Sequence, residues 1–388
     1  MPTRREFIRV AAAAGPLAAL SCVTERKHDA LRTPKPNIIF FLADDMGLGD
    51  THVYQDYTKL DDAQQVVTPN MERLASKGVR FLQAYSPGAA CAPTRRSIMM
   101  GEYMRREFGA ATTLPQALKK GGYRTYGVGK WHLPFAYGPT CRSDVPIALG
   151  PFSIGFDHYA GTRGNIRKSG AYYVDRTVMK YDEDSKSLRP NDSDKEPGYD
   201  KPGGPREEIS QQFWLDYGRR WISGHLVGGT QAHRPFFLYY PSHANHVHHR
   251  PPDKLDEIPV VNMVYTADGK PLDKDRNNLV KVRSEMIYEN DVAVGILLDW
   301  LEKHDDPRNP GHKMIDNTLF VFTSDNGAES APGTPGQGQF RGRKTNPWEA
   351  GSRVPFIARW GKQFPEGSTS NQIFSGVDFF ATFAAVAG

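Results

Sequence analysis

The chain has 388 residues, of which 39% are apolar, 24% charged and 11% aromatic, a composition typical of a globular protein that holds one large domain or two of medium size. Its formal net charge is +5, but lysine and arginine are scattered among aspartate and glutamate, which argues against a surface dedicated to nucleic acid. Three cysteines, Cys22, Cys91 and Cys141, are too few for a disulfide framework and favour individual roles.

The first 33 residues have the pattern of an export signal followed by a linker. Two arginines and Phe7 precede an alanine-rich apolar stretch at residues 10–20, which is typical of a twin-arginine signal. That stretch is too short for a membrane-spanning helix. Residues 17–22 also resemble a lipoprotein cleavage site, in which Cys22 carries the lipid. We expect an exported protein, periplasmic or at the cell surface, that contacts a membrane only if Cys22 is lipidated.

From residue 34 onward, apolar runs typical of buried strands alternate with segments of helical spacing. The strands are predicted at residues 37–42, 79–84, 123–128, 235–240, 319–323 and 354–360. The helices are predicted at residues 68–78, 91–100, 113–120 and 283–304. This alternation predicts an α/β sandwich with a largely parallel central sheet flanked by helices, forming one domain over residues 34–388.

Residues 139–210 differ from the rest of this domain. They are rich in Asp, Lys, Pro, Gly and Ser and contain few apolar runs. We expect them to form a long insertion that passes over the surface.

Two pairs of oxygen-bearing side chains follow predicted strands. Asp44 and Asp45 come after the first strand, and Asp325 and Asn326 follow the strand at 319–323. One such residue after a strand usually caps a turn. Two pairs at the carboxyl edge of one sheet favour a metal site instead, with hard oxygen ligands that suit calcium or magnesium rather than zinc.

Cys91 stands at the start of the helix predicted over residues 91–100. Backbone amides at a helix N-terminus favour anions and nucleophiles, although a free cysteine is more often buried and inert. An unmodified thiolate there, with Arg95 and a histidine lowering its pKa, would indicate a cysteine hydrolase.

Several cationic or imidazole side chains also follow predicted strands. Lys130 and His132 lie two residues apart and would face the same side of an extended segment. Lys344 stands in a basic turn that would ordinarily be solvated. Four histidines crowd into seven residues, either for chemistry or as a soft-metal site: His243, His246, His248 and His249.

Together these segments resemble the formylglycine-dependent arylsulfatase family of the alkaline-phosphatase-like superfamily, from about residue 36 to the end of the chain. The most specific match is CAPTR at residues 91–95, which fits the family signature Cys-x-Pro-Ser/Thr-Arg. Supporting matches occur in family order: TPNM at 68–71, GKWHL at 129–133, DNG at 325–327, Lys344, and EAGSRVP at 349–355.

The resemblance implies that a formylglycine-generating maturation enzyme oxidises Cys91 to Cα-formylglycine, whose hydrate attacks the sulfur of a sulfate ester. The alcohol then leaves, and the second hydroxyl of the hydrate expels sulfate. By the same resemblance one calcium ion, rather than magnesium, is held by the modified Cys91 together with four other ligands: Asp44, Asp45, Asp325 and Asn326.

The resemblance also assigns the remaining polar residues. Arg95, Lys130 and Lys344 would bind the transferring sulfuryl group, and His132 would be the base for the second hydroxyl. A histidine of the 243–249 loop would protonate or hydrogen-bond the leaving oxygen. Alignment from the preceding strand favours His246, with His248 as the alternative, because the family's His-x-Pro pattern is missing here.

The implied activity is hydrolysis of sulfate esters, with a sulfated small molecule or glycan as substrate and no nucleic-acid partner. The family usually continues into a smaller C-terminal subdomain, which is expected to be missing or truncated here, since the sequence stops at Gly388. Two alternatives stay open. One is a phosphonate or phosphodiester hydrolase of the same superfamily, and the other is an inactive protein that binds sulfated glycan.

Overall fold

The computed structural model describes most of the chain from Pro34 onward. The described residues are 34–60, 66–104, 112–165, 171–197 except 183 and 186, 215–224 except 216 and 222, 232–246, 279–329, and 335–388 except 362. The predicted export signal, with Cys22, lies outside them, as do His248 and His249. Among the described residues, no helix is both long enough and apolar enough to span a membrane.

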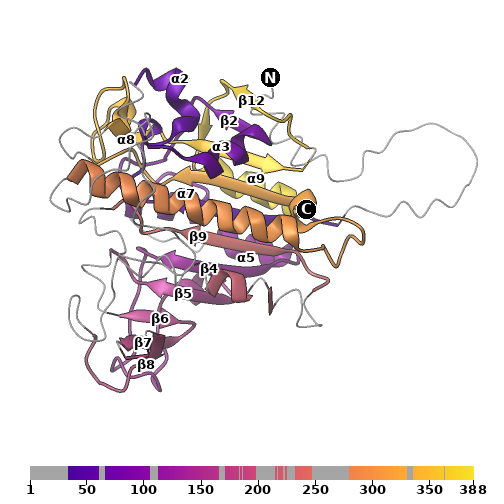
Figure 1. The fold of residues 1–388 in the computed structure, drawn as a ribbon. Coiled ribbons are helices and arrows are strands. Elements are labelled where there is room, and N and C mark those ends of the chain that lie inside the picture. Colours follow the sequence, from indigo (N-terminus) through magenta and orange to yellow (C-terminus); the bar gives the residue numbers. More distant parts are fainter. Residues whose placement is uncertain are drawn as a thin grey trace, which may run out of the picture.

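A single large sheet runs through the described part of the domain (Figure 1). Its eleven described strands follow the order β12-β2-β11-β10-β1-β9-β4-β5-β6-β7-β8. The five central strands are parallel to one another: β10 (Thr318–Ser324), β1 (Asn37–Ala43), β9 (Phe236–Pro241), β4 (Arg124–Lys130) and β5 (His158–Thr162). The predicted α/β sandwich with a largely parallel sheet is therefore confirmed.

The sheet becomes antiparallel towards both edges. On one side β11 (Phe356–Trp360) pairs antiparallel with β10 and with β2 (Val79–Phe81), and the edge strand β12 (Ser368–Ser370) is parallel to β2. A separate two-stranded sheet joins β3 (Ala84–Tyr85) to β13 (Phe374–Ser375).

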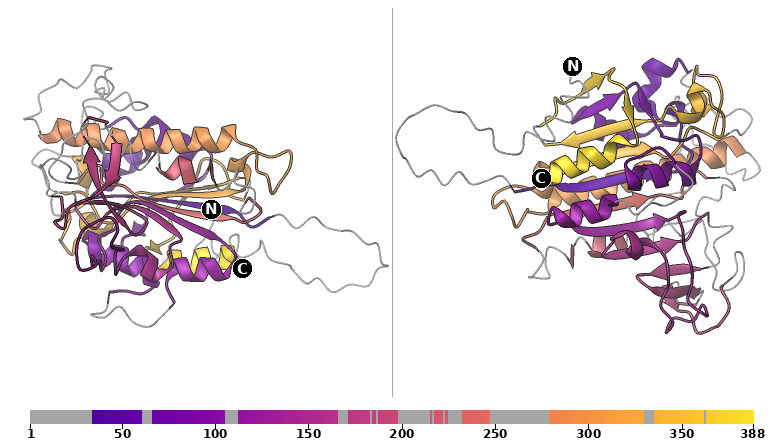
Figure 2. Two further views of the ribbon diagram at one scale, coloured as in Figure 1. Left: turned by 90° about the horizontal axis from the view of Figure 1, so that it is seen from below. Right: turned by 180° about the vertical axis from the view of Figure 1, so that it is seen from behind.

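Helices cover both faces of the sheet (Figure 2). One face carries α3 (Pro69–Ser76) and α7 (Leu279–Lys303). The other carries α4 (Cys91–Met100), α5 (Leu114–Lys120) and α9 (Asp378–Ala387). Two shorter helices, α2 (Gln55–Thr58) and α8 (Glu349–Ser352), lie in connecting segments. Each helix predicted from apolar spacing is present, with ends shifted by a few residues.

The central position of β1 in the sheet explains why its sequence is apolar without a break. Side chains alternate between the two faces of a strand, so a central strand with helices on both sides must be apolar at every position. Ile39 and Phe41 pack in the core shared with α3 and α7. Ile38 and Phe40 pack in the core shared with α4, α5 and α9.

The segment at residues 139–210 contains more regular structure than its composition indicated. Besides β5 it supplies three antiparallel strands that extend the sheet: β6 (Tyr172–Val174), β7 (Thr177–Asp182) and β8 (Ser187–Pro190). The expected course over the surface is wrong for β5 and β6, since Tyr159, Tyr172 and Tyr173 are buried, whereas β8 is half-buried to exposed. Their aromatic side chains are interspersed with polar residues, so no long apolar run marks them. The domain boundaries stay predictions.

We expect Phe40→Ala to lower the free energy of unfolding by about 3–5 kcal/mol. Phe40 is fully buried, and its ring centroid lies 4.6 Å from that of Phe379 and 5.5 Å from that of Phe383. Urea-induced unfolding measures the change. Ile373→Ala is the control, because Ile373 is 56% exposed. Equal effects of the two substitutions would contradict the assigned core.

Candidate active site

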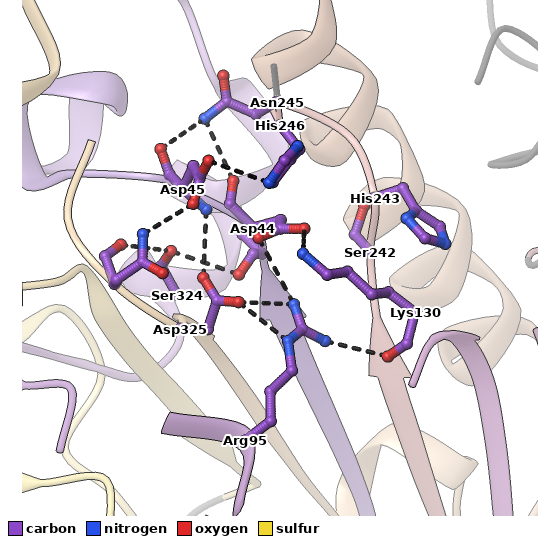
Figure 3. Close-up of polar contacts among 12 residues, drawn as sticks. Asp44, Asp45, Arg95, Lys130, Ser242, His243, Asn245, His246, Ser324 and Asp325 are labelled. Carbon is purple, nitrogen blue, oxygen red and sulfur yellow. Dashed lines mark hydrogen bonds and ion pairs between the residues drawn. The ribbon is translucent and has the colours of Figure 1, made fainter. Parts of the chain in front are cut away.

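The predicted site residues gather at the carboxyl edge of four adjacent strands (Figure 3). Asp44 and Asp45 follow β1, and Asp325 and Asn326 follow β10. Lys130 ends β4, and the loop after β9 carries His246. Residues that are far apart in the chain meet here because the four strands are parallel and neighbouring.

Pairing of β1 with β10 sets the positions of the acidic residues. The register places Ala43 beside Ser324, and the amide of Asp325 continues the ladder by donating to the Ala43 carbonyl over 3.1 Å. The amide of Asp45 then donates to Oδ1 of Asp325 over 3.2 Å. A Cβ on Gly327 would lie 1.7 Å from the Ala350 carbonyl oxygen, so only glycine fits directly after Asp325 and Asn326.

Three carboxylates converge without access to water. Asp44, Asp45 and Asp325 are fully buried, and each offers an oxygen within 4.8 Å of the others. Within the described residues, Oδ1 of Asp44 and Oδ1 of Asn326 are buried without a hydrogen-bond partner. Buried oxygens of this kind need a partner, and clustered hard oxygens suit a divalent cation. The residues present therefore fit a metal ion of the calcium or magnesium type.

The pKa shifts of these carboxylates also favour a bound cation. Burial and the negative charge of Asp44 raise the pKa of Asp325 well above its usual value. Burial opposes ionisation of Asp44 as well, but the charges of Lys130, His246 and Arg95 lower its pKa well below the usual range. Asp325 thus carries the energetic cost of like charges, which a bound cation would relieve.

Cys91 is the first residue of α4, as predicted, and is only 7% exposed. Its Sγ, a carboxylate oxygen of Asp44 and a ring nitrogen of His246 lie within 4.8 Å of one another. Burial disfavours the thiolate, but the charge of Lys130, a hydrogen bond with His246 and the charge of Arg95 outweigh it and lower the pKa of Cys91. Cys91 therefore faces the carboxylate cluster in an environment that stabilises negative charge.

Each of the three predicted cationic residues is held by a carboxylate. Arg95 donates from Nε and Nη2 to Oδ2 of Asp325, over 3.0 and 2.7 Å, and from Nη1 to the Lys130 carbonyl. Lys130 donates to Asp44, and Lys344 donates to Asp45 over 2.6 Å. Lys344 is no solvated turn residue, since its side chain is only 14% exposed. An anionic group placed beside Cys91 would meet these three cations.

The structure separates the histidine candidates. Nε2 of His246 lies 3.3 Å from Nζ of Lys344 and 3.7 Å from Oδ2 of Asp45, so this ring faces the cluster. His243 turns elsewhere, with its Nε2 2.8 Å from the hydroxyl of Thr162. His248 lies outside the described residues, so the choice between His246 and His248 stays a prediction.

His132 interacts electrostatically with the same charged residues, but its backbone is not extended as the sequence predicted. The predicted extended segment ends near Lys130, because His132 is left-handed with φ 56° and its amide donates to the Arg163 carbonyl. Burial, together with the charges of Lys130 and Arg95, lowers the pKa of His132 to about 3. The ring is therefore neutral at ordinary pH and is a weak base in this environment.

Two supporting residues escaped the sequence analysis. Asn245 and Arg283 both donate to the backbone carbonyl of Asp45, over 3.0 and 3.1 Å. A signal for Arg283 was available, since it lies at helical spacing with Ile287 and Val294 on the buried face of α7, where a charge is unusual. Asn245 gave no comparable signal between its histidine neighbours.

The family model described as Sulfatase matches residues 36–388. An N-acetylgalactosamine-6-O-sulfatase of Bacteroides thetaiotaomicron is 27% identical over 422 residues, covering 93% of this chain and 74% of the relative. The N-acetylgalactosamine-6-sulfatase of Homo sapiens is 28% identical over 389 residues, covering 91% of this chain but only 62% of the relative.

Solved structures share the fold. One, from work on the metabolism of multiple glycosaminoglycans by Bacteroides thetaiotaomicron, superposes with a TM-score of 0.69 at 24% identity and covers 92% of this chain and 78% of that one. Another, in complex with a neocarrahexaose, gives a TM-score of 0.59 at 24% identity, with 91% and 72% covered. With a family model matched over nearly all of the described domain, the chain belongs to the sulfatase family.

Proposed function

We propose that the protein hydrolyses sulfate esters, converting R–O–SO₃⁻ and water to R–OH and sulfate, by means of Cα-formylglycine made from Cys91 and one bound calcium ion. The observation that carries this proposal is the position of Cys91, whose Sγ lies within 4.8 Å of both an Asp44 oxygen and a His246 nitrogen. Membership of the sulfatase family supports the same reaction.

A thiol alone does not suit this reaction, and a dedicated maturation enzyme is proposed to supply the oxidation. Formylglycine in its hydrated form supplies two hydroxyl groups, one to attack sulfur and one to expel sulfate by regenerating the aldehyde. The chain contributes the position of this group at the N-terminus of α4, where the first backbone amides favour developing negative charge.

The calcium ligands are proposed to be Asp44, Asp45, Asp325 and Asn326, with the modified Cys91 beside them. A calcium ion held by these residues would supply positive charge that favours ionisation of the hydrate and polarises a sulfate oxygen. The buried oxygens of Asp44 and Asn326 that lack partners within the described residues support this ligand set.

Arg95, Lys130 and Lys344 are proposed to bind the sulfuryl oxygens. All three side chains are largely or fully buried and fixed by hydrogen bonds, so they need little reorganisation when charge develops on sulfate. Fixed donors in a site shielded from water stabilise a transition state more than water does. The two lysines bind different carboxylates, Lys130 that of Asp44 and Lys344 that of Asp45.

The two histidines are proposed to move protons. His132, neutral because its pKa is about 3, accepts the proton of the second hydroxyl once the negative charge of sulfate is in the site. His246, which faces Lys344 and Asp45, hydrogen-bonds or protonates the departing alcohol oxygen. The position of the His246 ring beside the cluster supports its proposed role.

A sulfated carbohydrate is the proposed substrate class. Relatives named N-acetylgalactosamine-6-sulfatases support sulfated sugars, as does a solved relative bound to D-glucosamine-2-N,6-O-disulfate. An exported protein, periplasmic or at the cell surface, would meet such glycans there, and the twin-arginine pattern of residues 1–33 motivates this location. Lipidation at Cys22 would place it on a membrane.

Sulfate is favoured over phosphate or phosphonate because the acidic cluster is proposed to bind a single metal ion. The two groups of metal-capable side chains found among the described residues share Asp44, so they do not make a second site. A phosphoryl substrate carries more negative charge and would be expected to use a second cation.

Activity is expected to depend on conversion of Cys91. After expression with a maturation enzyme, mass spectrometry of the peptide containing Cys91 should show the mass loss of thiol-to-aldehyde conversion. The protein should then turn over an aryl sulfate well and the matching aryl phosphate poorly. Cys91→Ala should abolish turnover, whereas Cys141→Ala, the control, should not. Full activity with an unmodified thiol would refute the proposed nucleophile, and preference for the phosphate would favour the phosphoryl hydrolase.

Calcium is expected to stabilise the fold as well as to support turnover. At a concentration one hundred times its Kd, calcium should add about 2.7 kcal/mol to the free energy of unfolding, and a chelator should remove this gain together with activity. Asp325→Asn should abolish the calcium-dependent shift in the unfolding midpoint. Asp299→Asn, on the exposed side of α7, should keep it. Turnover that persists without bound metal would contradict the calcium role.

The leaving-group histidine can be identified by comparing His246→Gln with His248→Gln. His246→Gln should lower kcat about 10²–10⁴-fold for a sugar sulfate, whose alcohol needs a proton to leave. The loss should be much smaller for an aryl sulfate with an acidic phenol. A leaving-group-dependent loss in His248→Gln instead would assign the role to His248.

A further inference from the structure

The backbone of Asp45 is held in an unusual conformation. Its φ is 54°, in the left-handed region that residues with a Cβ seldom adopt. Such a conformation costs free energy and persists where surrounding contacts impose it. At Asp45 it turns the chain directly after β1, so that the carboxylates of Asp44 and Asp45 both reach the metal-type cluster.

Two donors from different elements fix the peptide oxygen of Asp45. Nδ2 of Asn245, in the loop after β9, donates to it over 3.0 Å and also contacts the Asp44 carbonyl at 3.4 Å (Figure 3). Nη2 of Arg283, on α7, donates to it over 3.1 Å. All of these residues are buried, so water does not compete for the carbonyl. We call these two side chains the Asp45 clamp.

The guanidinium of Arg283 is paired with the carboxylate of Asp50. Both of its Nη atoms bind the carboxylate of Asp50, which also accepts a hydrogen bond from the Gly47 amide over 2.8 Å. Asp50 therefore ties Arg283 to the loop that follows Asp45. The guanidinium reaches Asp45 through the backbone carbonyl and leaves the Asp45 carboxylate to Asn326 and Lys344.

We propose that Arg283 and Asn245 are positioning residues that fix the main chain of Asp45 so that its carboxylate is aimed at the metal. The inference rests on the proposed calcium site. Groups that hold a metal ligand in place typically change metal affinity about 10–100-fold when they are removed. Neither clamp residue touches the metal or the substrate in this role.

If Arg283 acted only through its charge, its removal would have the opposite effect on calcium affinity. A positive charge near the cluster repels a cation, so its removal would strengthen calcium binding if charge alone mattered. Loss of the clamp would weaken calcium binding instead. Asn245 is neutral, so its removal tests geometry without changing charge.

The test measures calcium binding by titration calorimetry on the full matured chain after metal has been stripped with a chelator. Arg283→Met and Asn245→Ala should each raise the calcium Kd about 10–100-fold. Arg283→Lys should also raise it, because lysine keeps the charge but loses the planar fork that reaches Asp45 and Asp50 together. If Arg283→Met does not fold, Arg283→Lys and Asn245→Ala decide the outcome.

Arg308→Met is the matched control. Arg308 also pairs with an aspartate, Asp306, and donates to a backbone carbonyl, that of Lys35 over 2.7 Å. Lys35 lies before the amino end of β1, whereas Asp45 follows its carboxyl end. Arg308→Met should therefore leave the calcium Kd unchanged. An unchanged or lowered calcium Kd in both Arg283→Lys and Asn245→Ala would overturn the role of the Asp45 clamp but leave the calcium site standing. If the unsubstituted protein binds no calcium, both the clamp and the calcium site are overturned.

Discussion

The parallel pairing of β1 with β10 brings buried negative charges together, and much of the surrounding structure compensates for them. The register that sets Ala43 beside Ser324 places Asp44, Asp45 and Asp325 within a few ångströms of one another with no access to water. Buried carboxylates in contact repel each other strongly unless cations or donors are supplied. The cost is visible at Asp325, whose pKa is raised by burial and by Asp44.

Cationic side chains from three different segments compensate these negative charges. Arg95 from α4, Lys130 from the end of β4 and Lys344 from the segment before α8 each bind one of the three carboxylates. These partners hold the carboxylates in place, and the unsatisfied oxygens of Asp44 and Asn326 within the described residues show that they do not use all of the available acceptors. A divalent cation would complete the set, so the same residues serve both the stability of the fold and the proposed chemistry.

Much of this could be predicted from the sequence because the relevant signals are local. Unbroken apolar runs marked the central strands, and the polar residues directly after them marked the edge where the site lies. The strands at 158–190 were missed because aromatic residues such as Tyr159 and Tyr172 are mixed with polar ones and give no apolar run. The left-handed turn at His132 was missed because it depends on the contact of its amide with Arg163, a residue of another strand end.

The environment of Cys91 also bears on why its thiol would need to be converted. Lys130, His246 and Arg95 lower the pKa of the thiol, so they would stabilise any anion at this position. A thiolate that attacked sulfur would leave a thiosulfate-like adduct with no second oxygen through which to release sulfate. A hydrate at the same place keeps the electrostatic advantage and adds that release route. The charge distribution around Cys91 therefore suits an oxygen nucleophile as well as a thiolate, and the proposed turnover chemistry would require the oxygen.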